Sequence, residues 1–255
     1  MNALSLDVLL EIAEYLDASS LHRLLSSSKQ MWKLRNDDRF GQKIFPYKDH
    51  IENEDWSNGL VESVKNQNFS QMQFFINKGG WEFEHEAMME AAKSGSRHMI
   101  SFLIRNGCES WKGAMCGASE SNDLDLMEYL VDQGANEFDD ALIIASENNF
   151  RNIIDYIFTQ SDCDPDEPMI AACKGGHKEL VEYYIKKGAS NCDIGLITAA
   201  EFCHMELVKL FLDLDAIDPF RDGGWYTSTD PDINLLLQEE YQKAKRKWRV
   251  PNGLY

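Results

Sequence analysis

The sequence is poor in positive charge. It has 25 lysine and arginine residues against 43 aspartate and glutamate residues, which leaves a formal net charge of −18. Proteins that bind the phosphate backbone of nucleic acids gain most of that affinity from lysine and arginine, which release counterions from it. The charge balance therefore argues against nucleic acid as a partner.

Cysteine pairs and long hydrophobic spans are lacking as well. The six cysteines form no C-x-x-C pair and several lie in apolar helical patterns, which favours reduced core thiols over disulfides or zinc. The N-terminal stretch MNALSLDVLLEIAEYL contains three acidic residues and no basic leader, unlike a signal peptide or a membrane span. We therefore expect a monomeric intracellular protein of the cytoplasm or nucleus, without membrane contact.

The sequence also lacks a catalytic constellation. There is no G-x-x-x-x-G-K-[S/T] phosphate loop, and no cysteine or carboxylate partner stands at metal-ligand spacing from His22, His50, His85 or His98. His177 and His204 occupy equivalent places in the repeat described next, where we expect hydrogen bonds in turns. The sequence thus predicts no cofactor, no metal and no enzymatic activity.

What the sequence has instead is a repeat of 27 residues that occurs six times. Its first apolar column is Met72, Met99, Leu126, Ile153, Leu180 and Leu207. Two more columns, three and four positions later, are Phe75, Phe102, Tyr129, Tyr156, Tyr183 and Leu210, and then Ile76, Leu103, Leu130, Ile157, Tyr184 and Phe211. These spacings place the side chains on one face of a helix.

A second helix precedes this one in each repeat. It is marked by the apolar column Val61, Met88, Met115, Leu142, Met169 and Leu196. Pairs of small residues follow that column at Ala91-Ala92, Ala118-Ser119, Ala145-Ser146, Ala172-Cys173 and Ala199-Ala200. Small side chains allow two helices to approach closely, so we expect these helices to pack against one another.

Glycine and asparagine mark the ends of both helices, because they tolerate the left-handed conformation that ends a helix. Between the helices we expect it at Asn68, Gly95, Asn122, Asn149 and Gly176, and after the second helix at Gly80, Gly107, Gly134 and Gly188. Candidate N-caps of the first helix are Asn58, Asp139, Asp166 and Asp193, and Pro168 falls in a first turn. Each unit is therefore a helix, a turn, a helix and a short loop.

The fifth unit, A-C-K-G-G-H-K-E-L-V-E-Y-Y-I-K-K-G-A from Ala172 to Ala189, resembles the ankyrin repeat. The resemblance implies an all-α fold, an ankyrin-like helical solenoid of six short units over residues 58–219. The usual ankyrin unit has 33 residues and opens with a T-P-L-H turn. Both that turn and six residues are missing here, so we expect short loops in place of projecting β-hairpins.

Residues 220–255 predict a terminal capping helix. Asp230-Pro231 supplies an N-cap and a proline at the first helical position. One face of this helix is lined by Ile233, Leu237, Tyr241, Ala244 and Trp248. Its basic end, KAKRKWR, suits the negative end of a helix dipole; a nuclear-import or acidic-partner patch is the alternative interpretation.

Residues 1–47 do not follow the repeat, and residues 48–57 read as a linker. On a helix over residues 6–16, Asp7, Glu11 and Glu14 form one narrow stripe, which leaves apolar side chains over an arc of roughly 220°. One small domain does not easily cover such an arc. The segment therefore predicts either a protein partner or burial against the first repeat.

These N-terminal residues resemble an F-box. Leu4, Asp7, Val8, Ile12, Leu16, Leu21 and Leu24 match its leucine-rich positions, and Trp32 and Phe40 lie near its aromatic ones, while Ser5 and Ser27 depart from it. The resemblance implies docking on the Skp-type adaptor of a cullin–RING ubiquitin ligase through Leu4, Asp7, Val8, Leu9, Ile12, Leu16, Leu21 and Leu24. The repeats would then hold the client protein.

Aromatic and acidic residues gather in the early loops between repeats and are candidates for client binding: Trp81, Phe83, Glu84, Glu109, Trp111, Glu137, Phe138 and Asp139. Aromatic side chains are common interface anchors. An apolar residue after a helix-ending glycine can equally fold back onto its own last turn. The acidic charge predicts a client with a basic patch.

An F-box followed by ankyrin units is similar to the arrangement in proteins of large DNA viruses of amoebae and in bacterial effectors delivered into eukaryotic cells. The first interpretation is thus a substrate adaptor that redirects a host's ubiquitin ligase. The second is a scaffold or inhibitor whose N-terminal helices only cap the solenoid.

Overall fold

A computed structural model describes residue 50, residues 53–214 and residues 228–248, with side chains to residue 243. The described residues form thirteen α-helices and no β-strand. The expected all-α class is therefore confirmed. The F-box-like residues and the rest of segment 1–47 lie outside the described residues.

The chain divides into two compact units. The first comprises Met1–Ser121 and Glu128–Asn136, and the second comprises Asn122–Met127 and Glu137–Tyr255. The first unit contains α6 (Trp56–Lys65), α7 (Phe69–Asn77), α8 (Glu84–Lys93), α9 (Arg97–Arg105) and α10 (Trp111–Glu120). The helix α11 (Leu124–Asp132) is shared between the units.

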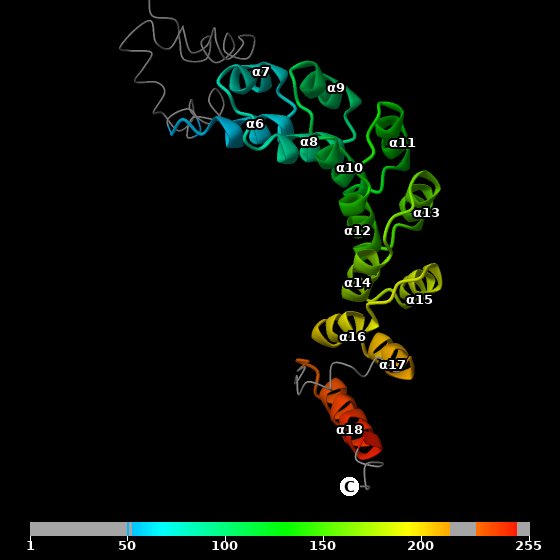
Figure 1. The fold of residues 1–255 in the computed structure, drawn as a ribbon. Coiled ribbons are helices and arrows are strands. Elements are labelled where there is room, and N and C mark those ends of the chain that lie inside the picture. The colour runs from blue at the N-terminus through cyan, green and yellow to red at the C-terminus, as the bar shows by residue number, and fades with distance from the viewer. Residues whose placement is uncertain (1–49, 51–52, 215–227, 249–255) are drawn as a thin grey trace, which may run out of the picture. The chain divides into compact units, whose positions relative to one another are not determined.

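The second unit contains α12 (Asp139–Glu147), α13 (Arg151–Gln160), α14 (Asp166–Gly175), α15 (Lys178–Lys187), α16 (Cys192–Glu201), α17 (Met205–Asp213) and α18 (Pro231–Trp248). Within this unit the first helices of the repeats, α12, α14 and α16, follow one another in a row (Figure 1). Within the first unit α6, α8 and α10 do the same, with α7 and α9 beside them (Figure 1).

The helix pairs confirm the repeat. The apolar column that starts at Met72 is at most 1% exposed in all six units. The column four positions later, from Ile76 to Phe211, is buried in every unit, and so are the five pairs of small residues. The column between them is half-buried after Phe75, so its aromatic rings lie at the edge of the helix contacts.

One expectation needs correction, because the period slips by one residue after the first unit. Leu60, and not Val61, is fully buried in α6, one position before the column that runs through Met88. The left-handed residues of this unit are Gln67 and Gly79, where the strict period predicts Asn68 and Gly80. An extra residue between α7 and α8 therefore sets the first repeat off from the other five.

The remaining turns follow the prediction. Gly95, Asn122, Asn149 and Gly176 have φ angles between +55° and +75°, and Gly107, Gly134 and Gly188 end their helices at φ of +100° to +108°. Cys203 takes this conformation in the sixth unit, with φ of +62°. In the fourth unit Ser161 occupies the position of Gly107 and has an extended backbone, so α13 ends without a left-handed residue.

The predicted N-caps of the first helices lie one or more residues too far along the chain. Asp55 caps α6, and its carboxylate accepts hydrogen bonds from Asn58. The capping positions of α12, α14 and α16 are Phe138, Pro165 and Asn191. Asp139, Asp166 and Asp193 therefore lie within the first turn, where a carboxylate is stabilised by the positive end of the helix dipole. Pro168 is in the first turn of α14, as expected.

Glycines in α10 allow its backbone to touch that of α8. A Cβ atom at Gly113 would overlap the carbonyl oxygen of His85, and one at Gly117 would overlap that of Met89. Both glycines are buried within a helix, where glycine costs about 1 kcal/mol relative to alanine. The close approach of the two backbones accounts for their presence.

The loops between repeats are short, and the C-terminal helix begins where the sequence predicts. Connections such as 106–110 and 188–191 contain no strand, in agreement with the shortened unit. The Asp230 carboxylate accepts the backbone N–H of Asp232 at 2.8 Å, and α18 starts at Pro231. Ile233 and Leu237 are buried, and α18 contacts α17.

The contact between α8 and α10 predicts the effect of adding one methyl group. We expect Gly117→Ala to lower the free energy of unfolding by about 2 kcal/mol, because overpacking exceeds the gain in helix propensity. Urea denaturation followed by circular dichroism measures this. As a control, Glu86→Ala on the exposed side of α8 should change it by less than about 0.5 kcal/mol. A Gly117→Ala variant of unchanged or higher stability would contradict the packing described here.

Candidate protein interaction surface

The loops that precede α8 and α10 lie side by side and bring several predicted client-binding residues together. The Nδ1 atom of His85 is 3.4 Å from the Oγ atom of Ser110. The Cys108 thiol donates a weak hydrogen bond to the Glu84 carbonyl oxygen at 3.9 Å. Glu84 and the segment that contains Glu109 and Trp111 are therefore neighbours, although about 25 residues separate them in the sequence.

Two carboxylates of this region, those of Glu84 and Glu109, lie near the buried thiol of Cys108. The pKa of Cys108 is raised to about 11, chiefly by burial and in smaller part by the nearby charges of Glu84 and Glu109. Both carboxylates therefore affect the same thiol and lie close together in the first unit. Glu109 is exposed and Glu84 is half-buried, so together they give this edge a negative potential that water only partly screens.

The aromatic candidates of the first unit combine packing with exposure. Trp81, Phe83 and Trp111 are each half-buried. The backbone N–H of Trp81 donates to the Gly79 carbonyl oxygen at 2.9 Å, directly after the helix-ending turn. These rings are therefore partly packed against the protein and still present apolar surface to solvent.

The three candidates of the second unit behave differently from one another. Phe138 is 6% exposed and precedes α12, so its ring belongs to the packing of that helix. Glu137 and Asp139 are exposed. Burial chiefly raises the pKa of the neighbouring Cys163 thiol, and the Asp139 carboxylate raises it as well.

Asp166, at the start of α14, joins two consecutive repeats through hydrogen bonds. The Asp166 carboxylate accepts backbone N–H groups from Ser190 at 2.6 Å and from Asn191 at 3.2 Å, and the Ser190 hydroxyl at 3.2 Å. This carboxylate fastens the loop before α16 to the start of α14. Its hydrogen bonds make Asp166 a structural residue of the loop edge.

Two histidines also link consecutive repeats, at the C-terminal ends of the first helices. The Nε2 atom of His177 lies 2.8 Å from the Glu147 carbonyl oxygen, and that of His204 lies 2.9 Å from the Lys174 carbonyl oxygen. Each ring thus reaches the last turn of the preceding repeat's first helix and satisfies a carbonyl that has no partner within its helix. Within the described part of the chain, no three histidine, cysteine, aspartate or glutamate side chains cluster as metal ligands.

Ion pairs at the same helix ends are a feature that the sequence analysis missed. Lys93 Nζ is 2.7 Å from Glu120 Oε2, and Lys174 Nζ is 2.7 Å from Glu147 Oε1. Burial lowers the pKa of Lys93, but hydrogen bonding and charge at Glu120 and Glu90 outweigh it and raise the pKa. The partners in each pair are 27 residues apart, so opposite charges in one repeat column would have been a signal for them.

The thiols differ in environment. Burial raises the pKa of Cys173 to about 12 and also raises that of Cys192. Cys203 is the exception, because the hydroxyls of Ser228 and Thr229, at 3.4 Å and 3.2 Å from its Sγ atom, lower its pKa. The pKa values of Cys108, Cys163, Cys173 and Cys192 are raised, whereas that of Cys203 is lowered.

Comparison with known proteins agrees with the helix pairs. The family model for ankyrin repeats (3 copies) matches residues 88–168 and residues 142–222, which together span more than half of the chain. A search of curated proteins finds no match. No helix in the described residues is both long and apolar enough to cross a membrane.

The thiol environments predict selective alkylation. At about pH 8 we expect iodoacetamide to modify Cys203 first, because its lowered pKa gives it a larger thiolate fraction than a free cysteine, and the thiolate is the nucleophile. Peptide mass spectrometry over time measures the order. Cys173 should stay unmodified until the protein unfolds. A Ser228→Ala, Thr229→Val double variant should slow alkylation of Cys203; an unchanged rate would show that these hydroxyls do not activate it.

Proposed function

Because the chain belongs to the ankyrin-repeat family, and ankyrin repeats form protein interaction domains, we propose that it is the substrate-recognition adaptor of a cullin–RING ubiquitin ligase. In this proposal residues 1–47 dock on the Skp-type adaptor and the repeats bind the client. The protein acts inside a eukaryotic cell, in the cytoplasm or nucleus, including as a viral or bacterial product in a host. A single chain suffices for this division of labour.

The observation that carries the proposal is the pairing of two sequence features in one chain. The N-terminal segment has apolar residues over most of its predicted first helix, in an order that resembles an F-box. It is followed by repeats whose described residues contain no cluster of metal ligands. An array of protein-binding repeats suits a protein that brings a client to a separate enzyme.

A scaffold or inhibitor is the second candidate function, and one feature favours it. The C-terminal end of the second unit is covered by α18, whose Ile233 and Leu237 are buried. Solenoids need covers at both ends, because a terminal repeat otherwise exposes its apolar face. Leucine-rich helices before α6 would serve the same purpose at the other end without docking on any adaptor.

Binding to a Skp-type adaptor separates the two candidates. We expect the full-length protein to retain a purified eukaryotic Skp-type adaptor in a pull-down. An Ile12→Asp, Leu16→Asp double variant should lose it while its circular dichroism stays helical, because charges on the docking helix would be desolvated at the interface. Leu235→Asp is the matched control, since Leu235 is 57% exposed on α18. Absence of wild-type binding, together with a thermally destabilised double variant, would favour the scaffold.

The client surface is proposed at the adjoining starts of α8 and α10, around Glu84, Glu109 and Trp111. We expect a client with a basic patch, whose dissociation constant rises roughly tenfold between about 50 mM and about 300 mM salt. Glu84→Lys with Glu109→Lys should weaken the client's binding further, as measured by isothermal titration calorimetry. Asp213→Lys, at the exposed end of α17, should not. Affinity that is indifferent to salt and to both glutamates would place the client elsewhere.

A further inference from the structure

The second helices of consecutive repeats meet through a recurring contact. The first residue of one second helix touches the half-buried aromatic ring of the next. Arg97 lies 4.9 Å from the ring centre of Tyr129, and Arg151 lies 4.1 Å from that of Tyr183. At the equivalent place in the first repeat Phe69 meets Phe102, with ring centres 5.4 Å apart and nearly perpendicular planes.

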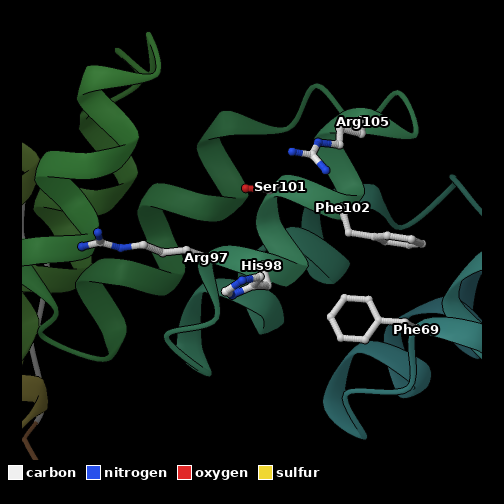
Figure 2. A pocket seen from close by; sticks show the side chains of 6 residues that line it. All are labelled: Phe69, Arg97, His98, Ser101, Phe102 and Arg105. Atoms are coloured by element: carbon white, nitrogen blue, oxygen red, sulfur yellow. The ribbon is translucent and has the colours of Figure 1, made fainter.

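Because Phe69 takes the place that Arg97 and Arg151 have in their repeats, the first unit has an aromatic pair that is open to solvent. Phe69 is 41% exposed, and its contact with the half-buried ring of Phe102 makes the two rings one apolar surface. Figure 2 shows the rings of Phe69 and Phe102 facing each other across the space between α7 and α9. That space is a groove of about 370 Å³, lined by Phe69, Arg97, His98, Ser101, Phe102 and Arg105.

The charge of the groove is opposite to that of the protein. The helix α7 has no charged residue and α9 has no acidic one, whereas the chain as a whole has a net charge of −18. Arg105 is exposed and forms no ion pair with any described residue. In Figure 2 the Arg97 side chain extends away from the rings of Phe69 and Phe102, and Arg97 contacts the ring of Tyr129. Arg105, which lines the groove together with the two rings, therefore supplies the positive charge for recognition.

The spacing of these residues suits an extended peptide. His98, Ser101 or Phe102, and Arg105 follow one another at three or four residues and share one face of α9. Phe102 and Arg105 are three positions apart, which is about 4.5 Å along a helix axis. An extended chain covers about 3.3 Å per residue, so an apolar side chain on Phe102 and a carboxylate that faces Arg105 would lie one or two residues apart in a bound segment.

We propose that this groove binds an acidic peptide segment of a protein partner. One apolar side chain of the segment packs against Phe69 and Phe102, and a neighbouring carboxylate of the segment pairs with Arg105. Arginine pairs with carboxylates through two parallel hydrogen bonds, which gives the contact direction as well as strength. The site is separate from the acidic edge at the starts of α8 and α10, and it does not depend on the F-box-like segment.

The peptide used to test this proposal is obtained by selection. Random peptides of about twelve residues, displayed on phage, are selected on the full-length protein, and those enriched are synthesised with a fluorescent label. We expect peptides of negative net charge that contain an acidic residue one or two positions from an apolar one. Their dissociation constants, measured by fluorescence anisotropy, should rise at least roughly tenfold for Phe69→Ser and for Arg105→Glu, because each change removes one part of the recognition.

The control variant is Lys65→Glu, which makes the same change of charge on the exposed end of α6, in the same unit. It should alter peptide binding by less than about twofold, a difference that screening of distant surface charges makes small. Circular dichroism shows that the variants remain folded. If Phe69→Ser is destabilised, Arg105→Glu alone decides, since its side chain is exposed.

Five results would overturn the proposal. The first four are enrichment of no peptide, enrichment without acidic bias, binding that neither groove variant affects, and self-association of the protein that both variants abolish. The fourth would identify a second copy of the chain as the occupant. A labelled single-stranded oligonucleotide is included, because arginine and aromatic side chains also bind nucleotide bases. Its binding through the groove, in place of the acidic peptides, would overturn the proposal as well.

Discussion

The close contact between the first helices of consecutive repeats is the constraint on which the rest of this structure depends. A single helix pair cannot bury its apolar faces, so each repeat is stable only against its neighbours. Ala91, Ala92 and Gly117 let the backbones of α8 and α10 approach within the first unit. The ion pairs and histidine hydrogen bonds at the helix ends then hold neighbouring repeats in one register.

The short repeat determines which surfaces remain for binding. With no β-hairpin between the described repeats, the loops add little surface beyond the starts of the first helices. Carboxylates gather there in the first unit, around Glu84 and Glu109. The second helices α7 and α9 carry no carboxylate at all. The first unit therefore has two surfaces of opposite charge, which suits two partners of opposite character.

Sequence reasoning succeeded where one residue type has one physical role. Buried columns such as Ile153 and Ile157 follow from the period alone, and glycine or asparagine at Gly107 and Asn149 follows from a backbone conformation that few residues tolerate. It was wrong by one residue at Val61 and Gly80, because one inserted residue in a loop leaves the helix patterns almost unchanged. It misplaced the caps near Asp139 and Asp166, because aspartate is favourable both at the cap and in the first turn.

The sequence by itself determined that the protein is an all-α array of short ankyrin repeats, since its period and its turn residues are local properties. It is also the basis for the F-box-like interpretation of residues 1–47. Only the tertiary structure decided which side chains meet: Glu84 with the loop at Cys108, His177 with Glu147, and Phe69 with Phe102. Such contacts join residues 24 to 33 positions apart. They depend on how each helix is rotated against the next, and that rotation comes from packing between repeats, which the period does not contain.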